Sequence, residues 1–155
     1  MSEESNFDML FESIEEMVTV SVKATTTLQV ITTLLKKYVP HYDWVGFYMV
    51  DPKKERKLVL GPYSGAHTDH TRIPFGKGIC GQAAERGETF LIQDVSKEDN
   101  YLSCSINVKS EIVVPVFRDG KVVGQIDIDS HQLEPFTDED KEFLEKLAKL
   151  VSGLM

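Results

Sequence analysis

Residues 111–129 have the sequence EIVVPVFRDGKVVGQIDID, which is typical of two β-strands joined by a tight turn. Both runs are rich in valine and isoleucine, the β-branched residues that favour strands. The turn is Arg118-Asp119-Gly120-Lys121, and an Asp-Gly pair between two such runs favours a short hairpin connection. The stretch therefore predicts an antiparallel hairpin around which the rest of the fold is arranged.

Segments on both sides of this hairpin add helices and strands. Apolar residues at helical spacing predict helices, and short β-branched or aromatic runs predict strands. Ser5 is the expected N-cap of the first helix and Thr137 that of the last, with Asp140 completing a capping box. Helices are expected over about 5–17, 22–38, 82–86 and 136–155, strands over 43–50, 57–60 and 89–95, and loops over 61–71 and 96–109.

This order of elements predicts an α+β fold: an antiparallel sheet with the N- and C-terminal helices on one face. The long loops and the short middle helix are left to cover the other face, which is a natural place for a small-ligand pocket. A length of 155 residues suits one domain, divided into helices at 1–40, sheet and pocket at 43–130 and a closing helix at 136–155.

Composition excludes several classes of protein. The net charge is −8 and the basic residues are spread along the chain, so nucleic-acid binding is not expected. No window approaches eighteen apolar residues, which excludes a membrane-spanning helix. The acidic N-terminus lacks the features of a signal peptide, so we expect a cytoplasmic protein. The two cysteines cannot form a secreted disulfide framework, and are either inert apolar residues or redox-active thiols.

Three carboxylates are candidates for a functional cluster. Side chains alternate along a strand, so Asp127 and Asp129 share one face while Ile126 and Ile128 face the other way. If the isoleucines pack under helices, both carboxylates lie on the loop-covered side, where Glu111 of the neighbouring strand can join them. Clustered carboxylates raise one another's pKa, and a protonated one can act as a general acid. The alternative is a solvated face and an exposed strand end.

The two cysteines differ in their surroundings. Cys80 is at the start of the short middle helix, where the helix dipole favours a thiolate. Cys104 lies in a polar loop, which favours a reactive rather than a structural thiol. Trp44 and Tyr48 share one strand face and either line the pocket or belong to the core.

One histidine-rich segment is a candidate metal site. His67, Asp69 and His70 offer two imidazoles and a carboxylate. Without a further ligand cluster nearby in the sequence, an ordinary polar loop is the favoured interpretation, and no metal is expected.

Several segments together resemble the free methionine-R-sulfoxide reductases, a branch of the GAF-domain family. Their order and approximate spacing hold from residue 43 to the last helix. The matching runs are DWVGFY at 43–48, LVLGPY at 58–63, RIPFGKGICG at 72–81, SEIVVP at 110–115 and GQIDIDS at 124–130.

The resemblance implies a six-stranded GAF-type sheet, usually in a homodimer, with a pocket for free methionine sulfoxide. It implies that Cys104 is the attacking cysteine, with Cys80 able to resolve the sulfenic acid that forms. The acidic pocket residues then fall on Glu111, Asp127 and Asp129, and the aromatic wall on Trp44 and Tyr48. No bound cofactor is implied, because a thioredoxin-like reductant supplies the electrons.

Two alternatives use the same fold. His70 stands where the family commonly has a third cysteine, and Ser105 stands where an aspartate is expected. These departures favour a non-catalytic GAF sensor domain that binds a different small ligand. A third interpretation is a redox sensor in which Cys80 and Cys104 form a reversible disulfide.

Overall fold

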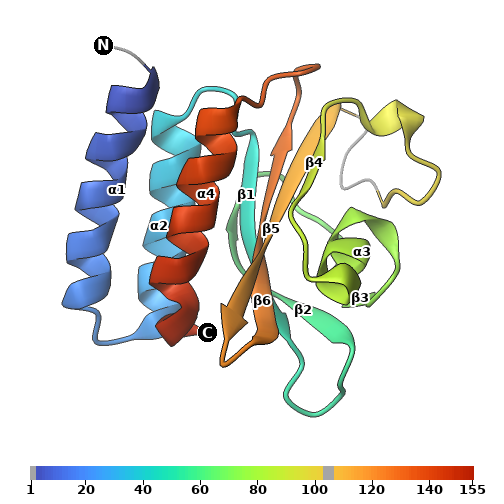
Figure 1. Cartoon of the computed structure of the whole chain (residues 1–155), viewed down its shortest axis with the longest axis horizontal. Helices are drawn as coiled ribbons and strands as arrows, with labels where there is room; N and C mark the ends of the chain where they lie inside the picture. The colour runs from blue at the N-terminus through green and yellow to red at the C-terminus, as the bar shows by residue number, and fades with distance from the viewer. Residues whose placement is uncertain (1–2, 103–106) are drawn as a thin grey trace.

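The computed structural model describes residues 3–102 and 107–155, and shows one antiparallel sheet between helices (Figure 1). The strands lie in the order β3-β2-β1-β6-β5-β4. The strands are β1 Trp44–Val50, β2 Lys57–Ser64, β3 Arg72–Pro74, β4 Phe90–Ile92, β5 Ser110–Arg118 and β6 Lys121–Ser130. The helices are α1 Glu3–Thr19, α2 Ala24–Tyr38, α3 Gly78–Arg86 and α4 Asp138–Val151, with short 3-10 turns at Val95–Lys97 and Ser152–Leu154.

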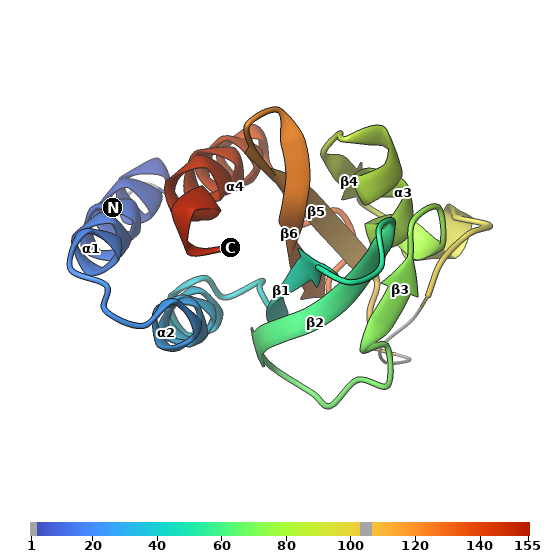
Figure 2. The same cartoon turned by 90° about the horizontal axis from the view of Figure 1, so that it is seen from below.

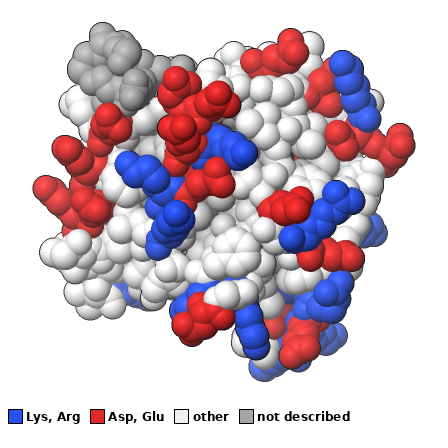
Figure 3. Space-filling view, in the orientation of Figure 1, with Lys and Arg blue, Asp and Glu red and all other residues white. Residues whose placement is uncertain are grey.

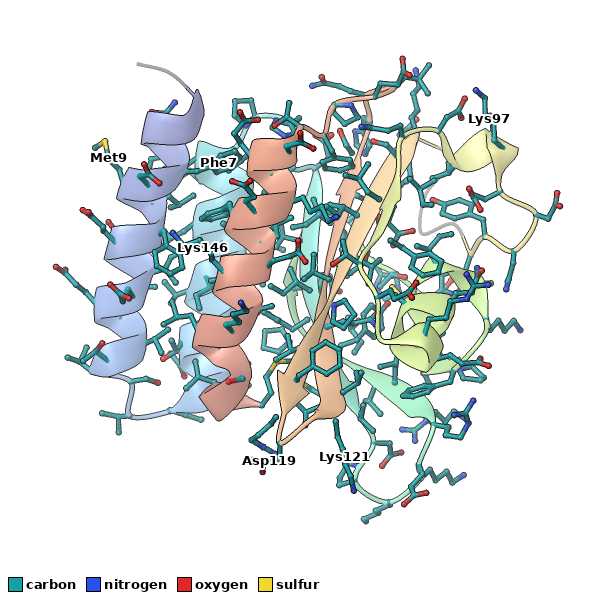
Figure 4. The ribbon with its side chains drawn as sticks, in the orientation of Figure 1. Phe7, Met9, Lys97, Asp119, Lys121 and Lys146 are labelled. Atoms are coloured by element: carbon teal, nitrogen blue, oxygen red, sulfur yellow. The ribbon has the colours of Figure 1, made fainter. Side chains whose placement is uncertain are left out.

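The elements form layers, and α3 lies on the opposite side of the sheet from the other helices (Figures 1 and 2). Helices α2 and α4 pack on one face, and α1 packs against α4 from the outside. Phe7 of α1 stacks on Phe143 of α4 at a ring distance of 4.7 Å, and Figure 4 shows Phe7 directed inward. The predicted α+β class is confirmed, with α1 farther from the sheet than the terminal-helix arrangement implied.

The hairpin expected from residues 111–129 is β5 and β6, which pair antiparallel along most of their length. Asp119 and Gly120 have positive φ angles of 54° and 77°, as a two-residue hairpin turn requires. Figure 4 shows Asp119 and Lys121 at the exposed tip. The hairpin places β6 beside β1 as well, so β6 is flanked by strands on both edges.

Capping of the last helix follows the sequence closely. The Thr137 hydroxyl oxygen caps α4 by accepting a hydrogen bond from the Asp140 backbone N–H. The Asp140 carboxylate accepts one from the Thr137 backbone N–H, which completes the predicted capping box. The expected cap at Ser5 is wrong, because α1 already includes this residue. Gly87 ends α3 in a left-handed conformation, which glycine adopts easily.

The strands next to the predicted loops depart most from expectation. Strand β2 continues to Ser64, and β3 at Arg72–Pro74 pairs with its first residues, so the loop expected at 61–71 is shorter. The strand expected at 89–95 is only β4, followed by a 3-10 turn. These short strands exist because neighbouring strands supply their hydrogen bonds, which a local pattern does not reveal.

The surface agrees with the spread of charge in the sequence. On the face drawn in Figure 3, Lys and Arg side chains are interspersed with Asp and Glu ones. Within residues 3–102 and 107–155, no helix combines the length and apolar character needed to cross a bilayer.

Candidate functional site

The candidate site lies on the sheet face that α3 covers. Strand alternation places Ile126 and Ile128 in the core under the helices, and turns Asp127 to the opposite side. Across β5 and β6, Glu111 pairs with Asp129 and Val113 with Asp127. The structure thus brings Glu111, Asp127 and Asp129 to one region, where all three side chains are buried.

Cys80 of α3 joins these carboxylates. Its Sγ lies 3.7 Å from Oε2 of Glu111, to which the thiol donates a hydrogen bond. Ligand atoms of Cys80, Glu111 and Asp127 all lie within 4.8 Å of one another. Gln125, on the same strand face, donates a hydrogen bond of 3.1 Å to the Cys80 carbonyl and so ties α3 to the sheet.

The environment of Cys80 opposes ionisation. Burial raises the pKa of the thiol well above its ordinary value of 9.0, and the nearby Asp127, Glu111 and Asp129 raise it further. The sequence prediction that the helix dipole favours a Cys80 thiolate is therefore wrong. A dipole equivalent to about half a charge does not compensate for desolvation beside several carboxylates.

Asp127 has a raised pKa as well. Burial raises the pKa of its carboxyl above 3.8, and hydrogen bonds with Glu111 and Cys80 only partly offset this effect. Its Oδ1 atom is buried and has no hydrogen-bond partner among the described residues. The raised pKa makes the protonated form of this carboxyl more accessible than that of an exposed aspartate, which suits a proton donor.

Asn100 fixes the chain that leads toward Cys104, a role that sequence reasoning missed. Its side chain accepts a hydrogen bond of 2.8 Å from the Gly78 backbone N–H and donates one of 2.8 Å to the Gly76 carbonyl. Gly78 has a φ of 67°, and a Cβ there would lie 2.9 Å from Cγ of Leu102. Only glycine suits this conformation and this approach. An isolated Asn in a polar loop gives no pattern from which to predict the contact.

The two aromatic residues of β1 have different surroundings. Tyr48 lines a small hollow that Cys80 also lines, and its hydroxyl donates a hydrogen bond of 2.8 Å to the His70 carbonyl. Trp44 stacks on Tyr63 and donates a hydrogen bond of 3.0 Å to the Ala66 carbonyl. Trp44 belongs to the same apolar cluster as Tyr48 but is not among the residues around that hollow.

We call this space the Cys80 hollow. It holds about 10 Å³ of free volume, which is room for about one water molecule. It is lined by Tyr48, His70, Ile73, Lys77, Gly78, Ile79, Cys80, Leu102, Glu111 and Asp127.

A larger hollow of about 500 Å³ lies between α1 and α2. The described residues that line it include Phe7, Tyr38 and His41 but no cysteine and no carboxylate. Chemistry rather than size therefore identifies the Cys80 hollow as the candidate site.

The remaining predicted residues are not part of the cluster. His67 and Asp69 lie 3.2 Å apart with strongly exposed side chains, as in an ordinary polar loop. His70 lines the Cys80 hollow. Cys104 and Ser105 lie outside the described residues.

Known proteins share both the sequence and the fold. Residues 23–155 match the family model described as GAF domain. The free methionine-R-sulfoxide reductase of Saccharomyces cerevisiae is 48% identical over 111 residues, which is 71% of this chain and 61% of that protein. The chain thus matches less than two thirds of the yeast protein's length. The free methionine-R-sulfoxide reductase of Escherichia coli is 37% identical over 78% of this chain and 71% of that protein.

A solved structure extends the match over nearly the whole chain. The free methionine-R-sulfoxide reductase of Neisseria meningitidis, solved in complex with its substrate, superposes with a TM-score of 0.93. It is 36% identical, and the match covers 99% of this chain and 90% of that one.

Proposed function

The chain belongs to the GAF domain family, and on that premise we propose that it reduces free L-methionine-(R)-S-oxide to L-methionine, using thiols as the electron source. Similarity to two curated reductases of this substrate and to a substrate-bound structure supports the proposal. The single observation that carries it is the buried Asp127 carboxyl with a raised pKa beside a thiol and Glu111. Sulfoxide reduction needs a proton donor at the oxygen, and this carboxyl is suited to that role.

The reaction we propose begins at Cys104. Its thiolate attacks the sulfoxide sulfur while a protonated carboxyl, assigned to Asp127, gives its proton to the oxygen. The oxygen then passes to the cysteine sulfur as the sulfoxide sulfur–oxygen bond and the newly formed sulfur–sulfur bond both break, so that methionine leaves and the cysteine is left as a sulfenic acid. A second thiol condenses with the sulfenic acid, releasing water and forming a disulfide. A thioredoxin-like dithiol then exchanges with this disulfide and supplies the two electrons.

Chain connectivity supports Cys104 in this role. Leu102 lines the Cys80 hollow, and the two residues that follow span at most about 7 Å of extended chain. Asn100 holds the preceding part of the segment against α3 through the Gly76 and Gly78 backbone. We therefore propose that Cys104, two residues after Leu102 in the sequence, acts at this pocket.

We assign Cys80 as the resolving thiol. Its high pKa makes it a poor first nucleophile but suits a thiol that reacts only after an oxidised partner forms beside it. Glu111, which accepts its hydrogen bond, can take the thiol proton and pass it to the oxygen of the sulfenic acid, which leaves as water when the disulfide forms. Glu111 and Asp129 also suit the ammonium group of an amino-acid substrate, because buried carboxylates attract a cation.

Substrate entry requires the pocket to widen. A free amino acid does not fit in a hollow of about 10 Å³. Leu102, which closes against Gly78, is the side chain we expect the substrate to displace.

The cellular setting follows from the thiol chemistry. We propose that the protein works as a homodimer in the cytoplasm, where thioredoxin-like proteins keep thiols reduced. Dimer formation is checked by sedimentation equilibrium of the reduced protein.

A GAF sensor domain that binds a small ligand without turnover is the alternative. The favouring observation is that Cys80, the cysteine among the described residues, is held as a protonated thiol.

A coupled assay decides between the two. NADPH oxidation is followed with thioredoxin and thioredoxin reductase, supplying the R and S epimers of free methionine sulfoxide separately. We expect turnover of the R epimer alone, and its loss in Cys104→Ser. Absence of turnover from folded, reduced protein with thioredoxin or small thiols would contradict the proposal and favour the sensor.

A single-turnover experiment tests the assignment of Cys80. Reduced protein is mixed with the R epimer and no reductant, and the methionine released is counted per chain. Cys80→Ser should still release one methionine, since Cys104 makes the attack, but should lose steady-state turnover with thioredoxin. If Cys80→Ser keeps full turnover with thioredoxin, an external thiol resolves the sulfenic acid instead.

A further inference from the structure

Three buried side chains in the Cys80 hollow present metal-binding atoms to one point. Sγ of Cys80 and carboxylate oxygens of Glu111 and Asp127 all lie within 4.8 Å of one another. They come from α3, β5 and β6, and the strand pairing of Val113 with Asp127 fixes the register of the two carboxylates. The sequence predicts that Glu111 can join Asp127, but not that Cys80 of α3 approaches them, because α3 is a separate segment of the chain.

The spacing of these atoms suits a tetrahedral ion. Zinc binds thiolate sulfur at about 2.3 Å and carboxylate oxygen at about 2.0 Å, which places the two donor atoms about 3.5 Å apart. The distance from Cys80 Sγ to Glu111 Oε2 is 3.7 Å. A shift of a few tenths of an ångström therefore brings both atoms into coordination distance.

A second observation, independent of the clustering, points to a ligand. The Oδ1 atom of Asp127 is buried without a hydrogen-bond partner among the described residues, in a side chain that lines the hollow. None of the ion pairs found in that part of the chain involves Asp127. A buried polar atom without a partner is unfavourable, and a bound cation would offset this cost. The free volume of about 10 Å³ beside it accommodates a single ion.

We propose that Cys80, Glu111 and Asp127 bind one zinc ion, which excludes the amino-acid substrate from the same pocket. A thiolate among the donors selects zinc over magnesium or calcium, which prefer oxygen ligands alone. On binding, the Cys80 S–H bond breaks, the proton of the thiol and the proton held by the Asp127 carboxyl pass to the buffer, and a zinc–sulfur bond forms, with no change of oxidation state. The exclusion of substrate rests on the proposed function; the binding of zinc does not.

Cobalt spectroscopy tests the ligands without any enzymatic activity. Co²⁺ replaces zinc in such sites and gives a thiolate-to-cobalt charge-transfer band only when a cysteine binds it. Because the chain has two cysteines, Cys104→Ser leaves Cys80 as its one thiol. We expect the band in the reduced wild-type protein and in Cys104→Ser, its absence in Cys80→Ser, and its loss when zinc is added.

Two carboxylate variants provide the affinity measurement. By calorimetry, Asp127→Asn should weaken zinc binding at least about 100-fold, beyond the effect expected for a residue that only supports a ligand. Asp119→Asn removes a carboxylate at the hairpin tip, far from the hollow, and should leave zinc binding unchanged (Figure 4). A band that persists in Cys80→Ser, a band seen in no protein, or equal affinities of the two carboxylate variants would each overturn the proposal.

Kinetics separate this proposal from the proposed function. With active protein, zinc should raise the apparent KM for the sulfoxide and leave kcat unchanged, and a chelator should reverse the effect. Zinc binding at Cys80 without any reductase activity would contradict the proposed function alone. Reductase activity with no zinc binding would contradict the zinc site alone.

Discussion

Two buried aspartates, one on each side of the sheet, show how differently the two faces are built. Asp140, in the first turn of α4, accepts hydrogen bonds from the Tyr42 hydroxyl at 2.7 Å and the Thr137 backbone at 2.8 Å, and it lies 2.7 Å from Nε2 of His41. Burial alone would raise the pKa of Asp140, but these contacts outweigh burial and lower it below 3.8. Asp127 keeps a buried oxygen without a described partner and has a raised pKa.

The difference in hydrogen bonding between Asp140 and Asp127 distinguishes a residue that stabilises the fold from one that is suited to catalysis. A buried carboxylate whose hydrogen bonds are satisfied stabilises the fold in its ionised form. A carboxyl left partly unsatisfied destabilises the fold at neutral pH but keeps a proton ready for reaction. The sheet face covered by α2 and α4 therefore contributes to stability, while the face covered by α3 carries the candidate site.

Replacing the reactive aspartate should have the largest effect. Asp127→Asn removes the carboxyl proton donor, and we expect turnover to fall by about 10²–10⁴-fold. The same variant should raise the melting temperature at pH 7, because folding no longer has to bury a carboxyl that is ionised in the unfolded chain at this pH. Steady-state kinetics and thermal melts measure the two effects.

The pH dependence of stability provides a control for the effect of Asp127→Asn on the melting temperature. With its raised pKa, native Asp127 holds a proton that the unfolded chain releases near pH 3.8, so wild-type stability falls as pH rises through the native pKa. The advantage of the variant should therefore shrink as pH is lowered toward 3.8. Unchanged turnover, or a melting difference independent of pH, would break the contrast between the aspartates.

Replacing Asp140 should have the opposite result: a loss of stability without a loss of turnover. Asp140→Asn should lower the free energy of unfolding by about 2–4 kcal/mol, because buried hydrogen bonds to a charged acceptor are lost. Turnover per folded molecule should not change. Urea unfolding at pH 7 measures the loss, with Tyr42→Phe, which removes one bond, as a control expected to cost about 1 kcal/mol.

The lowered pKa of Asp140 determines how the stability difference between wild type and Asp140→Asn changes as pH is lowered. The wild-type advantage over Asp140→Asn is fully present above pH 3.8 and is lost as pH falls below this value through the native pKa. An equal urea midpoint for the two proteins at pH 7 would remove the structural role assigned to Asp140.

The tie between Asn100 and α3 should have an intermediate effect. Asn100→Ala removes two hydrogen bonds to the backbone at Gly76 and Gly78, which costs about 1–2 kcal/mol of stability. If the hydrogen bonds of Asn100 position Cys104 for attack, their loss should lower kcat by about tenfold, because the reacting atoms are less well aligned, with little change in KM. Asn100→Asp keeps the acceptor and should recover part of kcat; equal kcat for all three proteins would limit Asn100 to a structural role.

The two aromatic residues of β1 should give the smallest difference. Trp44→Phe loses the hydrogen bond to Ala66 and should cost about 1 kcal/mol of stability, with KM within about twofold of wild type. Tyr48→Phe, at the Cys80 hollow, should raise KM more. An equal increase of KM in the two variants would indicate that Trp44 also contacts the substrate.

Much of this arrangement could be predicted from local patterns. Alternation along β6 correctly separated Ile126 and Ile128 from Asp127, because side-chain direction on a strand depends only on position. The capping box of Thr137 and Asp140 was equally local. Resemblance to a known family then indicated which of these residues deserve a functional role.

The sequence alone determined the main helices, the central hairpin and the two faces of β6, since these depend on neighbours within a few positions. Tertiary structure decided the short strand β3, the Asn100 tie and the chemistry of Cys80. A helix start favours a thiolate, yet burial beside Glu111, 31 positions along the chain, holds the thiol protonated. A pKa depends on desolvation and on charges brought near by folding, and neither is encoded in the spacing of residues.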